Sequence, residues 1–146
     1  MPKFTRGKAL ESLIAHQFAA LESRGWVCYD LRKESMFRGE NHDFLVISDK
    51  RIFAFDCKEC REDRFYFSIL DGGNGRKQLN TFARLLRLRP DVIAGFMIYF
   101  APKKRICFLT FQLVSDMIKN GGVYFSPDEH EYIDPNDLFG LKESEE

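Results

Sequence analysis

The segment that most constrains the fold is a predicted β-hairpin over residues 44–58. Residues 44–48 are apolar, Asp49 and Lys50 form a turn candidate, and residues 51–58 are rich in aromatic side chains. Side chains two positions apart on a strand share a face. Asp56 and Lys58 are therefore expected on one face of the second strand, at the point where it leaves the core.

Antiparallel pairing through that turn is expected to bring Asp43 back towards Asp56. Two carboxylates held close together repel each other unless a cation lies between them, and Mg²⁺ prefers such oxygen ligands. Lys58 beside them is suited to orient an attacking water or to offset charge that grows on a phosphate. The layout indicates a metal-dependent site for phosphodiester cleavage. The alternative is an exposed hairpin end whose charges are solvated, because a short D-x-K pattern also occurs by chance.

Length and composition favour a single globular domain over residues 1–146, with a frayed acidic end at 142–146. The chain is 45% hydrophobic and 14% aromatic, with fifteen Phe. No apolar run reaches the length of a membrane span, and the N-terminus lacks a signal-peptide pattern. We therefore expect a cytoplasmic protein without a membrane partner.

The formal net charge is zero, but the charges are segregated along the chain. Residues 76–105 carry an excess of seven positive charges, and residues 126–146 an excess of seven negative charges. A segregated basic surface can bind phosphates, so the neutral total does not exclude a nucleic-acid partner, which would place the protein near the nucleoid. An ordinary charged helix face is the alternative.

The four cysteines are expected to be reduced and mainly structural. Cys57 and Cys60 form a C-x-x-C, which is a candidate zinc half-site or redox pair. A structural zinc site needs a second closely spaced pair, and Cys28 and Cys107 are isolated in the sequence. If the strand continues to Cys60, the thiols of Cys57 and Cys60 also face opposite sides.

Residues 5–24 are predicted to form a helix that Thr5 caps and Gly25 ends. Its apolar stripe consists of Leu10, Leu13, Ile14, Phe18 and Leu21. Glu11 borders this stripe, where a carboxylate is costly unless something pairs with it. It is either a third acid of the hairpin site or a boundary residue that reaches solvent.

The remaining elements complete an α/β chain. Strands are predicted at residues 26–31, 64–70, 92–100, 105–111 and 123–125, and helices at 76–89 and 112–119, with a flexible turn at 71–75. Together they predict a mixed β-sheet flanked by helices, with a core in α-β-β-β-α-β order.

The predicted helix over residues 76–89 has one basic face. Lys77, Asn80, Arg84 and Arg87 recur at helical spacing, away from a core face centred on Phe82. Such a stripe is suited to follow a DNA backbone. Gln78, near the start of the helix, is expected to point towards the hairpin site.

Four short motifs resemble the PD-(D/E)XK nuclease superfamily, and most closely the Holliday-junction resolvases of the RecU and archaeal Hjc types. They are Arg6-Gly7-x-x-x-Glu11, Gly39-x-x-x-Asp43-Phe44, Phe55-Asp56-Cys57-Lys58 and Lys77-Gln78. The resemblance covers roughly residues 6–119 and implies a restriction-endonuclease-like core. Asp56 stands where the family more often has Glu.

The resemblance also implies roles for individual residues. Asp43, Asp56 and the carbonyl of Cys57 would bind Mg²⁺, or Mn²⁺ in its place, with Glu11 acting directly or through water. Lys58 would be the catalytic lysine and Gln78 a supporting catalytic residue. The basic residues expected to contact DNA are Arg6, Arg38, Arg76, Lys77, Arg84 and Arg87.

On this basis we expect a structure-selective DNA endonuclease that resolves four-way junctions in recombination and repair. The resolvases act as homodimers, which implies a dimer here, with Phe65, Phe67 and Tyr99 as candidate contacts. Two alternatives remain: another PD-(D/E)XK nuclease of the restriction or repair type, or a DNA-binding module of the same fold without catalytic activity.

Overall fold

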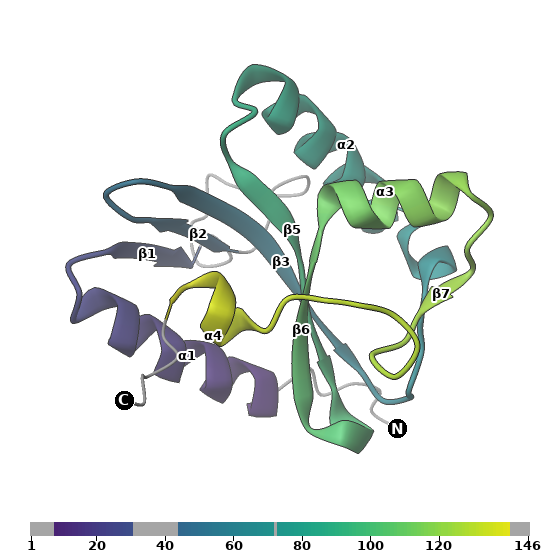
Figure 1. Ribbon diagram of the computed structural model, residues 1–146, viewed down its shortest axis with the longest axis horizontal. Coiled ribbons are helices and arrows are strands. Elements are labelled where there is room, and N and C mark those ends of the chain that lie inside the picture. Colours follow the sequence, from purple (N-terminus) through teal and green to yellow (C-terminus); the bar gives the residue numbers. More distant parts are fainter. Residues whose placement is uncertain (1–7, 31–43, 72, 141–146) are drawn as a thin grey trace.

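A five-stranded sheet with two parallel neighbours at its centre organises the molecule (Figure 1). The computed structural model describes residues 8–30, 44–71 and 73–140. Its strands are β1 (Val27–Asp30), β2 (Phe44–Ile47), β3 (Ile52–Cys60), β5 (Ile93–Phe100) and β6 (Arg105–Thr110), in the order β1-β2-β3-β5-β6. Only β3 and β5 pair in parallel, and the other neighbours are antiparallel. The mixed sheet predicted from the sequence is confirmed.

Helices cover both faces of the sheet. Helix α1 (Lys8–Glu22) and the short α4 (Pro135–Leu138) lie on one face, while α2 (Gly73–Leu88) and α3 (Phe111–Lys119) lie on the other (Figure 1). Helix α2 connects the parallel strands β3 and β5, because parallel neighbours need a crossover connection. The crossover fixes α2 against the strand that carries Asp56 and Lys58.

Two hydrophobic cores follow from the alternation of side chains along the strands. The core on the α1 face contains Phe53 and Phe55 of β3, with Cys57 packed against it. The core on the α2 face contains Ala54 and Cys60 of the same strand. Odd positions of β3 therefore face α1, and even positions face α2.

Helix α1 ends as the sequence predicts. Gly25 has a φ of 90°, a left-handed conformation that glycine adopts readily. The amide of Gly25 donates to the carbonyl of Glu22 at 2.9 Å, and the amide of Trp26 donates to the carbonyl of Leu21 at 3.2 Å. These bonds form a Schellman motif, which satisfies carbonyls at the helix end and leads the chain into β1.

The hairpin between β2 and β3 turns at the predicted position. Ile47 pairs with Ile52, and the amide of Ser48 donates to the carbonyl of Arg51 at 2.8 Å. The hydroxyl of Ser48 accepts from the amides of Lys50 and Arg51, at 3.2 and 2.9 Å. These side-chain bonds hold the two-residue turn and set the register of the hairpin.

The predicted strand over residues 64–70 is wrong for most of its length. Only Phe65–Tyr66 form a strand, β4, which pairs with β7 (Tyr124–Phe125) in a separate two-stranded sheet. Residues Phe67–Asp71 form a 3₁₀ helix. Phe67 and Leu70, three apart, are buried, whereas Ile69 is 56% exposed. Burial with a period of three suits a 3₁₀ turn better than a strand.

Two further predictions need correction. The segment 71–75 was expected to be a flexible turn, but α2 already begins at Gly73. Glycine disfavours helix by only about 1 kcal/mol per residue, which the packing of the following turns can offset. Helix α4 was not predicted, although Asp134 caps it through the amide of Asn136 and Pro135 starts it, a known start signal.

The aromatic residues expected at a dimer surface lie in the cores instead. Phe65 is 2% exposed, Phe67 4% and Tyr99 8%. Phe65 and Phe67 are buried because the chain after β3 folds over the α2 face, and Tyr99 faces α1. These three side chains are therefore unavailable to a second subunit in this conformation.

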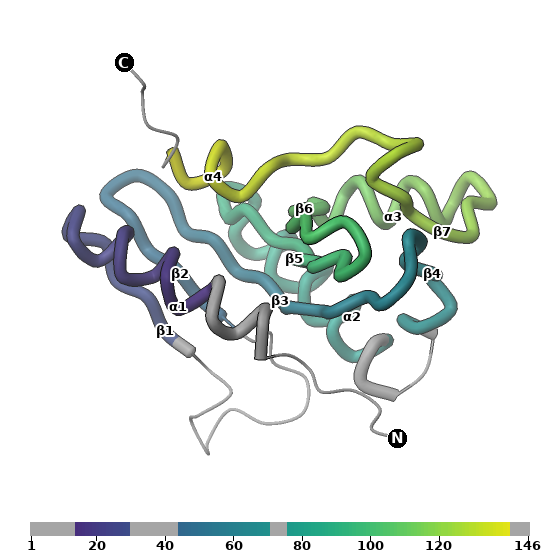
Figure 2. Tube along the Cα trace, turned by 90° about the horizontal axis from the view of Figure 1, so that it is seen from below, coloured from purple at the N-terminus to yellow at the C-terminus, as the bar shows by residue number. Residues whose placement is uncertain are grey.

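The segment between β7 and α4 crosses β6 and pairs with it at one position (Figures 1 and 2). The amide of Phe108 donates to the carbonyl of Ile133 at 2.8 Å, and the amide of Ile133 donates back at 3.2 Å. The segment thereby covers part of an edge strand that would otherwise present unpaired backbone groups. No helix in the described part of the chain is long and apolar enough to cross a membrane.

Candidate active site

The candidate site lies on the α2 face of β3. Asp56 and Lys58 occupy even positions of the strand, so both belong to the face that α2 covers. Asp56 is 0% exposed, while Lys58 is partly exposed. In the parallel register Asp56 pairs with Phe96 and Lys58 with Ile98, both buried in the core of this face. A buried carboxylate and a partly exposed lysine thus stand side by side at the edge of an apolar layer.

Lys58 contacts the helix above it. The ammonium group of Lys58 donates a hydrogen bond to Oε1 of Gln78, with an Nζ–Oε1 distance of 2.8 Å. Gln78 is 9% exposed and lies near the start of α2. The structure therefore brings together two side chains that are twenty positions apart in the sequence. A neutral amide oxygen accepts from the ammonium and restricts its direction without neutralising its charge.

The second acid of the hairpin, Asp43, lies outside the described residues. Phe44, its neighbour in the sequence, begins β2 and pairs with Phe55, the neighbour of Asp56. The two rings stack with centroids 5.6 Å apart. Phe44, the first described residue of the hairpin, therefore lies opposite the residue that precedes Asp56 in β3.

Glu11 belongs to α1, but the structure describes only its backbone. Ile14 and Phe18 follow it at positions i+3 and i+7, which share one face of a helix. That face packs on the sheet, since Ile14 is 4% exposed and the ring of Phe18 meets Phe44 edge-on at 5.4 Å.

The described residues contain no cluster of three or more His, Cys, Asp or Glu side chains suited to hold a metal ion. Of the four predicted ligand positions, only Asp56 and Cys57 are described with their side chains. The donors available from the predicted set are carboxylate and peptide carbonyl oxygens, which fit Mg²⁺.

The basic face of α2 is exposed along its length. Arg76, Lys77, Arg84 and Arg87 are all exposed, whereas Phe82 on the opposite face is 0% exposed. The helix is amphipathic, so packing Phe82 into the core directs the basic residues outward. Arg6 and Arg38, also expected to contact DNA, lie outside the described residues.

The basic excess over residues 76–105 is smaller on the surface than in the sequence. Lys103 pairs with Asp128 at 2.6 Å, and Arg89 pairs with Asp91 at 2.7 Å. The hydrogen bond from Lys103 lowers the pKa of Asp128, and that from Arg89 lowers the pKa of Asp91. Asp128 of the acidic segment thus offsets one of the three positive charges at the β5–β6 turn, whereas Asp91 is already counted in the excess over residues 76–105. Helix α2 carries four exposed basic residues.

All four cysteines are free thiols. Cys57 and Cys60 face opposite sides of β3, as the strand period predicts, so they do not form one metal half-site. Burial raises the pKa of Cys28 to about 11 and that of Cys107 to about 12, and it also raises the pKa of Cys60. These three thiols are protonated at neutral pH and therefore weak nucleophiles.

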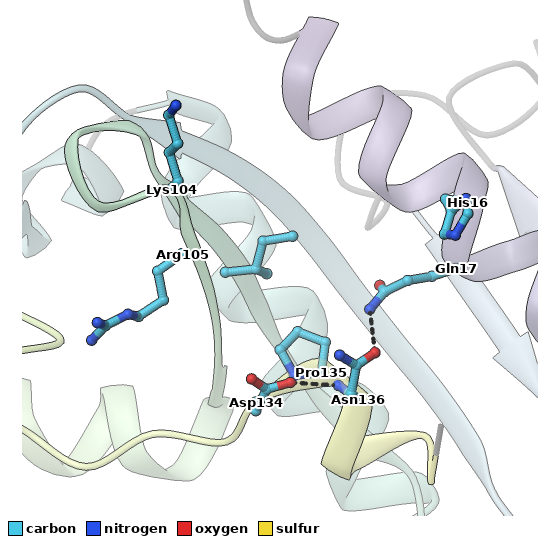
Figure 3. Close-up of a pocket in the computed structure, with 8 residues that line it drawn as sticks. His16, Gln17, Lys104, Arg105, Asp134, Pro135 and Asn136 are labelled. Carbon is cyan, nitrogen blue, oxygen red and sulfur yellow. Dashed lines mark hydrogen bonds between the residues drawn. The ribbon is translucent and has the colours of Figure 1, made fainter. Parts of the chain in front are cut away.

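A cleft of about 320 Å³ lies elsewhere, between α1, α4 and the β5–β6 turn (Figure 3). The amide of Gln17 donates to Oδ1 of Asn136 across it at 3.4 Å. Figure 3 shows Lys104 and Arg105 at its rim, with their charged ends directed away from this amide pair. None of the predicted site residues that the structure describes lines this cleft.

Comparison with known proteins supports the fold. No family model matches the sequence, and no curated protein matches it. A solved structure of Hjc, a Holliday junction resolvase from the archaeal hyperthermophile Archaeoglobus fulgidus, does match. The TM-score is 0.56 over 87% of this chain and 95% of that chain, at 15% identity. The two proteins share a fold. At this identity the likeness concerns the architecture, a mixed sheet with helices on both faces.

Proposed function

We propose that the protein is a metal-dependent DNA endonuclease that cuts branched DNA, with four-way junctions as its preferred substrate. The observation that carries the proposal is the hydrogen bond from Lys58 to Gln78 next to buried Asp56. A lysine fixed beside a carboxylate, in a chain with the fold of a junction resolvase, suits phosphodiester hydrolysis. Fold alone would not support this, because one fold hosts many activities.

The metal ligands in this proposal are Asp43, Asp56, the carbonyl of Cys57, and Glu11 either directly or through water. Mg²⁺, or Mn²⁺ in its place, would neutralise charge on the phosphate and lower the pKa of a water molecule. Continuing the β2–β3 register by one pair beyond Phe44 and Phe55 would set Asp43 opposite Asp56. That pairing is the reason to assign both carboxylates to one site.

Lys58 would act on the reacting groups themselves. Its ammonium is suited to orient the attacking water or to stabilise charge that develops on the phosphate. Gln78 would hold this ammonium in place, because its amide oxygen restricts the lysine to one direction. Lysine otherwise has a flexible four-carbon chain, and fixing it in advance lowers the entropy lost in the transition state.

The basic residues of α2 would bind the DNA backbone. Arg76, Lys77, Arg84 and Arg87 are exposed on the helix that also supplies Gln78. Phosphate contacts from this helix would therefore position the scissile strand relative to Lys58. Two copies of the chain would be needed to cut two symmetric strands of a junction, which is why we also propose a homodimer.

One comparison of substrates tests the proposal. The purified protein is incubated with Mg²⁺ and equal concentrations of a four-way junction, a flap, a linear duplex and a single strand. Preferential paired cleavage of the junction supports the proposal, as does a dimer mass in light scattering. Preferential cleavage of the flap or linear duplex would instead indicate a repair or restriction type of nuclease. DNA binding without cleavage of any substrate would indicate a binding module.

A further inference from the structure

Thr81, one turn after Gln78 on α2, has a buried hydroxyl oxygen without a hydrogen-bond partner. A threonine inside a helix can bond the carbonyl four residues earlier, but this one does not. Burying a hydroxyl without a partner is unfavourable, because the group loses its hydrogen bonds to water and gains none in the protein. No sequence motif singles out this residue, and a role for it can be inferred only from its position in the fold.

The position of Thr81 along β3 follows from two contacts of α2. Gln78 lies over Lys58, to which it is hydrogen-bonded. Phe82 meets Phe96 edge-on at 5.4 Å, and Phe96 is the partner of Asp56 in the sheet register. Gln78 therefore lies over the sheet position of Lys58, and Phe82 lies over the sheet position of Asp56 and its partner Phe96. Thr81 lies between these two positions.

The direction of Thr81 follows from helical geometry. Each residue turns the helix by about 100°, so Phe82 lies about 40° to one side of Gln78 and Thr81 about 60° to the other. Phe82 faces β5 and α3, because its ring contacts Phe96 and Phe111. Thr81 therefore lies on the flank of the helix away from Phe96 and Phe111, the side on which β3 and β2 follow β5 in the sheet. Asp56 is the buried carboxylate on that flank.

We propose that Thr81 is a positioning residue of the Lys58–Gln78 site. With metal bound, its hydroxyl donates a hydrogen bond to the carboxylate of Asp56 and fixes the orientation in which Asp56 holds the ion. Hydrogen bonds of this kind to a ligating carboxylate typically change metal affinity about 10–100-fold. The inference rests on the proposed function, because it requires Asp56 to be a metal ligand.

The test compares Thr81→Val, which removes the hydroxyl and keeps the shape, with Thr81→Ser, which keeps the hydroxyl. Mn²⁺ binding is measured by calorimetry on the purified protein, so the main readout does not depend on activity. We expect the valine variant to bind Mn²⁺ at least about tenfold more weakly, and the serine variant to stay close to wild type. Ser115→Ala, a hydroxyl removal on α3, is the matched control and should bind Mn²⁺ like wild type.

A second readout separates positioning from general stability. The cleavage rate is measured against Mg²⁺ concentration, and the valine variant should need more Mg²⁺ to reach half its maximal rate. Its rate at saturating Mg²⁺ should return to near the wild-type value. Its Tm without metal should be no lower than that of wild type, because the valine removes a buried hydroxyl that has no partner. If the valine variant does not fold, Thr81→Ala is measured against the same criteria.

The possible outcomes distinguish this inference from the proposed function. A folded valine variant that binds Mn²⁺ as tightly as wild type would overturn the role of Thr81 and leave the nuclease proposal intact. A serine variant as weak as the valine variant would also overturn it, since its hydroxyl should suffice. A wild-type protein that neither binds Mn²⁺ nor cuts DNA would overturn both.

Discussion

Nζ of Lys58 lies 2.8 Å from Oε1 of Gln78, a contact that joins the central strand β3 to the first turns of α2. The crossover between the parallel strands β3 and β5 makes this contact, because it lays α2 across the face that carries Lys58. The same helix displays its basic residues to solvent on its other side. One helix thus connects the candidate catalytic lysine to the surface expected to bind DNA.

Removing either partner of this hydrogen bond should slow cleavage, by different amounts. Lys58→Ala should lower kcat about 10²–10³-fold, the usual cost of losing one group that stabilises transition-state charge. Gln78→Leu should cost about tenfold, because Lys58 keeps its charge and loses only its fixed direction. Single-turnover cleavage of a four-way junction measures both. Equal losses for the two variants would contradict a purely orienting role for Gln78.

Asp56→Asn should abolish Mg²⁺-dependent cleavage while leaving junction binding within about threefold. The amide keeps the shape of the carboxylate and removes the negative charge that a hard cation needs. Electrophoretic mobility shifts measure binding, and cleavage assays with added Mg²⁺ or Mn²⁺ measure activity. The matched control is Asp49→Asn in the hairpin turn, which replaces an exposed acid and should change neither junction binding nor cleavage. Substantial cutting by the Asp56 variant would remove it from the proposed metal site.

The basic residues of α2 should determine the salt dependence of DNA binding. Each of Arg84→Ala and Arg87→Ala should reduce the slope of log affinity against log salt by about 0.9, the value for one phosphate contact. Lys119→Ala, an exposed basic residue at the end of α3, is the control and should leave the slope unchanged. Fluorescence anisotropy between 50 and about 300 mM salt provides the slopes. A slope that neither arginine changes would place the DNA on another surface.

Alkaline pH should destabilise the protein through Cys107. Its thiol has a pKa of about 12 in the folded protein, raised from 9.0 by burial, so the unfolded chain loses this proton first. The stabilising effect is fully present below pH 9 and is lost as the pH rises from 9 towards 12. Over that range the slope is about 1.4 kcal/mol per pH unit.

Urea unfolding of wild type and Cys107→Ala at several pH values isolates this contribution. The variant is expected to be less stable at pH 8, because it leaves a small cavity, and to lose less stability above pH 9. Tyrosine and lysine titrations contribute equally to both proteins and cancel in the difference. Parallel curves for the two proteins would contradict the raised pKa of Cys107.

Gly95→Ala should be strongly destabilising, by about 2 kcal/mol or more, through overpacking between two strands. A β-carbon at Gly95 would lie against the carbonyl of Leu109, closer than real contacts allow, and the neighbour is backbone that cannot move aside. Thermal unfolding followed by circular dichroism measures the loss. Gly121→Ala in the loop after α3 is the comparison, since space is open there and only its φ of 84° is unfavourable. The Gly95 variant should lose more Tm than the Gly121 variant.

Local patterns in the sequence account for most of the elements. The hairpin turn at Asp49 and Lys50, the end of α1 at Gly25 and the faces of β3 all follow from neighbouring residues. Strand periodicity and turn chemistry act over a few positions, so they can be read from the sequence. The segment over residues 64–70 was misread because its alternation is compatible with a strand, and tertiary packing favoured a 3₁₀ turn.

The candidate site could be read from the sequence only in part. The shared face of Asp56 and Lys58 follows from the strand period, but the buried environment of Asp56 depends on α2 above it. The exclusion of Phe65, Phe67 and Tyr99 from the surface likewise depends on which elements cover them. Asp43 and the side chain of Glu11 lie outside the described residues, so their membership of the site stays a prediction.

The sequence by itself determined the periodic features, namely which residues form strands and helices and which faces of these elements are apolar or basic. The tertiary structure alone decided which of those faces meet. Lys58 and Gln78 come together because a parallel crossover folds α2 back over β3, and Thr81 is directed to the Asp56 flank because Phe82 holds the rotation of that helix. Such contacts join residues far apart in the chain, and they depend on the packing of the whole sheet rather than on any local pattern.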